Sequence, residues 1–103
     1  AAPQEVTAVG HRLYKAATRA ALNAEQQRNC LIAHAEISKA SAFAEALRLL
    51  MTDGEINAAF SVDIRRLVSD IEKAEMRIHR KIASKAPSIM PTGGFSARTG
   101  MVP

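Results

Sequence analysis

Apolar residues recur every three or four positions through the second half of the chain, and this period predicts a long amphipathic helix that ends near Lys85. The stripe consists of Ile56, Phe60, Ile64, Leu67, Ile71, Ala74, Ile78 and Ile82. Thr52 is the expected N-cap, because Glu55 stands three residues after it, as in a capping box. Pro87 is expected to stop the helix, since proline lacks the backbone donor that a helix interior needs.

The first half of the chain carries the same period in two segments, which predicts two further helices. They are expected over residues 5–22 and 24–51. Their inner positions would be Val6, Val9, Leu13, Ala17 and Ala20 in the first helix, and Cys30, Ala33, Ile37, Ala40, Phe43, Leu47 and Leu50 in the second. Asn23 is expected to separate the two helices, as an N-cap whose capping box Gln26 would complete. One long helix without a turn is the alternative, and only Asn23 decides between the two.

No alternating pattern indicates a β-strand, so the predicted fold is all-α, an antiparallel three-helix bundle. We divide the chain into a three-helix domain, residues 1–86, and an extended tail rich in proline and glycine, residues 87–103. The tail carries the apolar residues Ile89, Met90, Phe95, Met101 and Val102. Such a segment cannot build a core of its own, so it either lies along a partner surface or forms a disordered end.

Composition limits the size and chemistry of the core. At 103 residues the chain has room for one domain, and 20 of these residues are alanine. Alanine favours helix but fills little volume, so a bundle built from it could gain stability from a partner. The single cysteine, Cys30, excludes an internal disulfide and a cysteine-based zinc site from this chain alone, and we expect it to be a small buried apolar residue.

The charge balance favours an acidic partner. The formal net charge is +4 and the pI is about 9.7. Nucleic acid, an anionic membrane surface and an acidic protein all remain open on this ground. No run of 18 apolar residues predicts a membrane-spanning helix.

Motifs that carry catalysis are missing from the sequence. It contains no phosphate-binding glycine loop, no nucleophile elbow and no zinc-protease helix. The histidines His11, His34 and His79 are far apart in sequence, and we expect ordinary surface or core-edge positions for them. Glu72 and Glu75 are neighbours on a helix, but the charged residues around them indicate a solvated face. The chain is therefore predicted not to be an enzyme.

Nucleic-acid binding remains an alternative. Basic residues crowd the last predicted helix, but Asp63, Asp70, Glu72 and Glu75 are interleaved with them, so they form no stripe of a single sign. Aromatic side chains, which stack on bases in single-strand binders, make up only 4% of the chain.

The segment Arg12-Leu13-Tyr14-Lys15, followed by Arg19, contains the only tyrosine of the chain. This segment resembles the signature of the LYR-motif family, which are small mitochondrial three-helix proteins. Phe43 stands thirty residues after Leu13, at the place where this family typically carries a phenylalanine on its second helix. The resemblance covers roughly residues 5–85. It departs from the family at Lys15, where arginine is commoner, and after Phe43, where Ala44 replaces an expected arginine.

The resemblance implies a partner and a location. LYR-motif proteins bind the mitochondrial acyl carrier protein, whose acyl-phosphopantetheine arm enters the space between the helices. This chain would accordingly be a non-catalytic accessory subunit of a respiratory complex, complex I-like, on the matrix side of the inner membrane, with no cofactor of its own. The implied partner-binding residues are Arg12, Leu13, Tyr14, Lys15, Arg19 and Phe43.

A structural role in a virion is a further alternative. The segments Ser61-Val62-Asp63 and Leu67-Val68-Ser69-Asp70, with Glu75, are faintly similar to internal ejection proteins of short-tailed phages. Alanine-rich basic helices suit that role as well.

Overall fold

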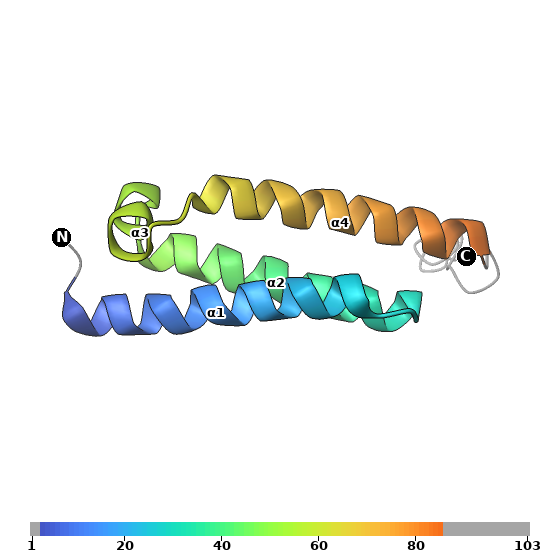
Figure 1. Ribbon diagram of the computed structural model, residues 1–103, viewed down its shortest axis with the longest axis horizontal. Helices are drawn as coiled ribbons and strands as arrows, with labels where there is room; N and C mark the ends of the chain where they lie inside the picture. Colours follow the sequence, from blue (N-terminus) through green and yellow to red (C-terminus); the bar gives the residue numbers. More distant parts are fainter. Residues whose placement is uncertain (1–2, 86–103) are drawn as a thin grey trace, which may run out of the picture.

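The computed structural model describes residues 3–85, and all of its regular structure in that range is helical. The elements are α1 (Gln4–Gln26), α2 (Cys30–Leu50), α3 (Asp53–Phe60) and α4 (Ile64–Lys85). Helices α1 and α2 form an antiparallel hairpin, α3 turns the chain at one end, and α4 runs back along the bundle (Figure 1). The all-α prediction is confirmed, but the described residues form four helices rather than three. The predicted tail and Pro87 lie outside them.

The break between the first two helices lies six residues later than predicted, at Asn29 instead of Asn23. The Asn29 side chain accepts hydrogen bonds from the backbone N–H groups of Leu31 at 2.9 Å and Ile32 at 3.1 Å. Helix α1 continues past Asn23 to Gln26, and the residue after Asn23, Ala24, is buried in the core. Both asparagines are good caps by type, so cap preference does not distinguish them.

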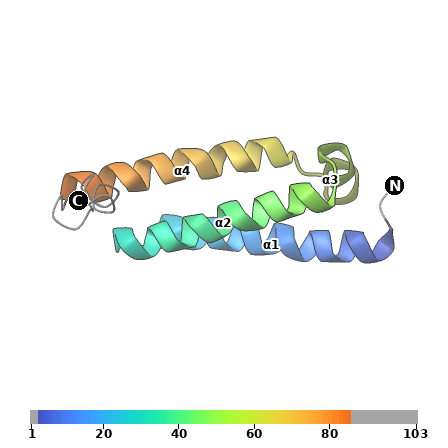
Figure 2. The same cartoon turned by 180° about the vertical axis from the view of Figure 1, so that it is seen from behind.

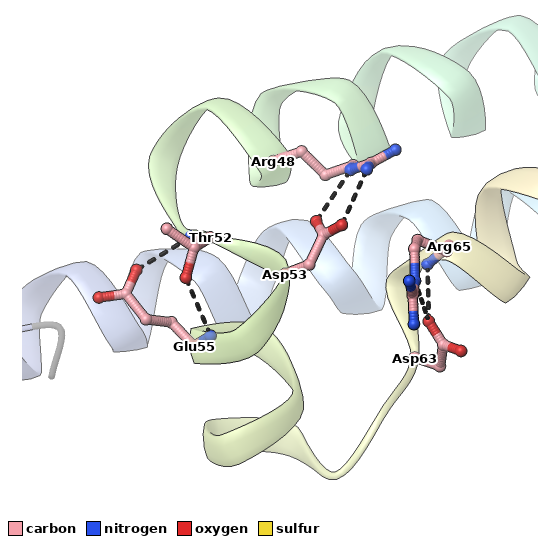
Figure 3. Close-up of polar contacts among 6 residues, drawn as sticks. All are labelled: Arg48, Thr52, Asp53, Glu55, Asp63 and Arg65. Carbon is pink, nitrogen blue, oxygen red and sulfur yellow. Dashed lines mark hydrogen bonds and ion pairs between the residues drawn. The ribbon is translucent and has the colours of Figure 1, made fainter.

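The predicted cap at Thr52 is confirmed. Its hydroxyl oxygen accepts a hydrogen bond from the backbone N–H of Glu55, and the Glu55 carboxylate accepts one from the backbone N–H of Thr52 (Figure 3). Next to this box, the Arg48 guanidinium donates two hydrogen bonds to the Asp53 carboxylate, at 3.0 and 2.9 Å. These contacts fix the turn from α2 into α3.

The single long helix predicted after Thr52 is wrong, because Ser61 adopts a left-handed backbone conformation with φ 57° and ends α3. The Asp63 carboxylate then accepts a hydrogen bond from the backbone N–H of Arg65, at the start of α4 (Figure 3). An aspartate side chain that bonds the nearby backbone in this way competes with helix. The apolar spacing from Phe60 to Ile64 is the same with or without a break, so the stripe could not reveal it.

Two clusters of buried residues form the core. The end cluster, beside α3, consists of Leu47, Met51, Ile56 and Ile64. The alanine cluster fills the rest of the bundle with Ala17, Ala20, Ala24, Ala33, Ile37, Ala40, Ala44, Ile71, Ala74, Ile78 and Ile82. Small residues on both facing surfaces let α1 and α2 pack closely, whereas α4 packs chiefly on α2 and touches α1 less.

Most predicted inner positions are buried, with a few corrections. Cys30 is partly exposed rather than buried, and Leu50 is 38% exposed, so it lies outside both clusters. On α1, Val9 is 45% exposed, and the neighbouring Gly10 faces the core instead. Phe60 and Leu67 are only partly buried.

Candidate docking face on the first helix

Three basic side chains share one exposed face of α1. Arg12, Lys15 and Arg19 are spaced by three and four residues and are all exposed. This spacing sets them on one side of the helix over roughly 10 Å, at 1.5 Å per residue. The only acids of α1 are Glu5 and Glu25, near its two ends, so its central part carries charge of a single sign. We call these three residues the basic face.

None of the three side chains is neutralised by a carboxylate within residues 3–85. The ion pairs in that range lie elsewhere and join Lys39 to Glu36, Arg48 to Asp53, Arg65 to Asp63, and Arg77 to Glu25. The basic face therefore offers three solvated cations to a partner, whereas the basic residues of α4 are mixed with acids.

Tyr14 belongs to the edge of the core. Its ring is partly buried and stacks on Phe60 of α3, with ring centroids 6.2 Å apart and planes at 16°. His11 approaches the same Phe60 ring at 5.5 Å and 41°. Phe60 thus packs against two α1 rings at the edge of the core, on a different side of α1 from the basic face. Offset aromatic pairs of this kind add modest stability beyond the area they bury.

The two predicted apolar contacts lie in different parts of the bundle. Leu13 packs against the end cluster, whereas Phe43 packs against the alanine cluster. Both side chains are partly buried. The arrangement leaves each of them at a rim of the helix interface, and their proposed contact with an acyl chain stays a prediction.

A cavity of about 370 Å³ opens between α2 and α4. Its lining consists of Ser41, Ala44, Glu45, Arg48, Leu49, Val68, Ile71, Glu72 and Glu75, which includes none of the predicted partner-binding residues. Its three glutamates form no ion pair with any residue in the range 3–85. An acidic carrier would be repelled at this opening, so charge favours the α1 side for such a partner.

Two carboxylates at the helix turns have lowered pKa values. Hydrogen bonding from the backbone of Thr52 lowers the pKa of Glu55 below its ordinary value of 4.5. Desolvation alone would raise the pKa of Asp63, but hydrogen bonds from the side chain and backbone of Arg65 outweigh it and lower this pKa. Both carboxylates are therefore charged at neutral pH, and each accepts a backbone hydrogen bond at the start of its helix, Glu55 at α3 and Asp63 at α4.

The described residues contain little that could hold a metal ion. No group of three or more His, Cys, Asp or Glu side chains converges anywhere between residues 3 and 85. His34 of α2 and His79 of α4, which are far apart in sequence, stack with ring centroids 5.1 Å apart.

Among the helices of the described part, none is long and apolar enough to cross a membrane.

Sequence reasoning missed two residues that shape the candidate site, Gly10 and Phe60. A Cβ atom at Gly10 would lie only 2.5 Å from Met51 Sδ, so glycine is what lets α1 approach the end of α2. A lone glycine in a helical pattern was the available signal. Phe60 was predicted as a core residue, but its contact with Tyr14 depends on the break at Ser61, which the pattern concealed.

Comparisons with known proteins found no relative of this chain. No family model matches the chain, and no curated protein or solved structure shows significant similarity to it. The resemblance to LYR-motif proteins therefore rests on the residues of this chain alone.

Proposed function

We propose that this chain is a non-catalytic docking protein that binds an acidic protein partner through the basic face of α1. The observation that carries the proposal is the set of three exposed cations, Arg12, Lys15 and Arg19, with no carboxylate of the described chain against them. Cations arranged in this way attract an acidic surface and raise the association rate, which makes binding strongly dependent on salt.

The resemblance to LYR-motif proteins narrows the partner to an acyl carrier protein. In this proposal the chain is an accessory subunit of a mitochondrial respiratory complex, and the carrier brings the acyl-phosphopantetheine. Lys15 and Arg19 would meet carboxylates of the carrier, and the acyl chain would enter beside Leu13 and Phe43. Each methylene of the acyl chain that the bundle buries would contribute about 0.8 kcal/mol.

The test is a charge reversal with a matched control. Lys15→Glu with Arg19→Glu should abolish copurification with an acyl carrier and leave helix content unchanged, since both side chains are exposed. The control, Arg66→Glu with Lys73→Glu, makes the same change in net charge at two exposed positions of α4 and should copurify normally. Intact-mass analysis of the partner should detect acyl-phosphopantetheine.

Two results would contradict the proposal. If both double variants lose the partner equally, overall charge drives binding and the basic face has no special role. If the wild type recovers no acyl carrier from mitochondria, the assignment to this partner fails.

Nucleic acid is the second candidate, because the same three cations could contact phosphates. Three contacts to duplex DNA would give a slope of about −2.7 in a plot of log affinity against log salt. Binding to a mixed-sequence duplex with that slope, lost in the Lys15→Glu, Arg19→Glu variant, would favour this reading over a protein partner.

A further inference from the structure

Helix α2 is apolar on the side that faces away from the core. Its core side carries Ala33, Ile37, Ala40, Ala44 and Leu47. The opposite side carries a row of exposed residues that we call the outer seam: Leu31, Ala35, Ser38, Ala42, Glu45 and Leu49, of which the last two also line the cavity beside α4. Leu31 is 52% exposed and Leu49 is 85% exposed, and Glu45 is the only charged residue of the row.

A surface helix ordinarily carries charged residues opposite its core, because that side faces water. Helix α4 follows this rule, with exposed Arg66, Lys73 and Arg80 on its outer side. Helix α2 does not, since its outer seam carries a single charge, Glu45, among leucine, alanine and serine residues that recur in steps of four and three. A second, mostly apolar side on a surface helix indicates a further contact with protein.

We propose that a second copy of this chain covers the outer seam, with the two α2 helices antiparallel about a two-fold axis that passes between Ser38 and Ala42. The spacing of the seam is symmetric about this axis and a leucine stands at each end, so two copies meet with leucine against leucine. In the antiparallel arrangement Leu31 of each copy meets Leu49 of the other, at both ends of the contact. Ser38 then lies opposite Ala42, and these small side chains allow the helices to approach closely.

The remaining pair also fits. Glu45 lies opposite Ala35, whose small side chain leaves the carboxylate a route to solvent. A two-fold contact uses the same patch on both copies, which is the commonest arrangement in soluble oligomers. The seam shares no residue with the basic face of α1, so the dimer goes beyond the proposed function.

The size of the seam sets the expected strength. A helix of 21 residues is roughly 30 Å long, and two such helices side by side bury on the order of 1,000 Å² in total. This area is at the low end for specific interfaces, where weak and transient contacts are found, so we expect a weak dimer.

Sedimentation equilibrium of the full chain, from about 1 to 200 μM, a range suited to a weak dimer, tests the dimer directly. The wild type should pass from monomer to dimer across this range. Leu31→Glu with Leu49→Glu should raise the dissociation constant at least about tenfold, because it sets charges at both ends of the contact. The matched control is Leu22→Glu with Met76→Glu, which charges two similarly exposed positions outside the seam and should dimerise as the wild type does.

Disulfide trapping tests the antiparallel register. In a Cys30→Ala background, Ser38→Cys and Ala42→Cys are made in separate chains. Mixed under mild oxidation, the two chains should form a 38–42 cross-link, while each chain alone should cross-link poorly, because identical positions lie a full helical turn apart.

Each unfavourable result is decisive. A wild type that stays monomeric at the highest concentration overturns the proposal and leaves the seam to a different protein. A dimer that survives the Leu31→Glu, Leu49→Glu change places the contact elsewhere. Efficient cross-linking of either cysteine chain with itself overturns the antiparallel arrangement.

Discussion

Replacing Gly10 by alanine should destabilise this protein, although alanine is the better helix former. The new Cβ atom would lie 2.5 Å from Met51 Sδ, 3.3 Å from Leu47 Cδ1 and 3.4 Å from Phe60 Cζ. Helix propensity would contribute about 1 kcal/mol in favour of alanine. Overpacking a core typically costs about 1–3 kcal/mol, so we expect a net loss of about 1 kcal/mol in the free energy of unfolding.

A second substitution tests whether the contact with Met51 causes this loss. Met51→Val removes the sulfur atom that the new Cβ would strike most closely. In that background Gly10→Ala should stabilise the protein by up to about 1 kcal/mol, because the gain in helix propensity remains while most of the clash is gone. The sign of the effect should therefore reverse, which corresponds to a coupling of about 2 kcal/mol between the two sites.

Urea denaturation followed by circular dichroism gives the required free energies, with Gly54→Ala as the control. Gly54 also lies in a helix, and nothing stands within 4 Å of a Cβ atom built there. Alanine at residue 54 should thus be neutral or stabilising in either background. The reasoning is refuted if Gly10→Ala stabilises the wild type as much as Gly54→Ala does, because α1 would then not be packed closely on Met51.

Two further predictions concern the helix ends. Asn29→Ala should lower the free energy of unfolding by about 1 kcal/mol, because it removes the α2 cap. Asn23→Ala should change that free energy little. Equal effects of the two changes in thermal melts would contradict the observed helix boundary. Glu55 and Asp63 have lowered pKa values when folded, so their contributions are present above their ordinary values of 4.5 and 3.8 and are lost as pH falls through the folded values. The melting temperature should accordingly decrease as the pH is lowered below about 4.5. Glu55→Gln keeps the capping box but not the charge, so it should weaken this pH dependence. An unchanged pH profile in that variant would show that the Glu55 charge contributes nothing.

The fold was predictable wherever a local signal decided the structure. The Thr52 capping box needs only residues three positions apart, and it formed as predicted. The choice between Asn23 and Asn29 had no such signal, because both residues are good caps by type. The break at Ser61 was hidden for a different reason: three non-helical residues leave the spacing of the apolar stripe unchanged.

In the candidate site, too, the features set by local sequence were predictable and those set by helix packing were not. The exposure of Lys15 and Arg19 follows from helical periodicity alone, and the structure has both side chains at the surface. The placement of Leu13 and Phe43 against separate clusters depends on how the helices pair, which one sequence does not reveal. The stacking of Tyr14 on Phe60 required both the helix break and the packing of α3 on α1.

The unequal packing of α4 has a consequence for the order of folding. Helices α1 and α2 are neighbours in sequence and pack closely, so their hairpin can form from local contacts at small loop-closure cost. Helix α4 packs mainly on α2 and lies along one side of the hairpin (Figure 2). It should therefore join last and detach first. Native-state hydrogen exchange should find that the amides of α4 open at a lower free energy than those of the hairpin, so that the bundle can part along one side without unfolding as a whole.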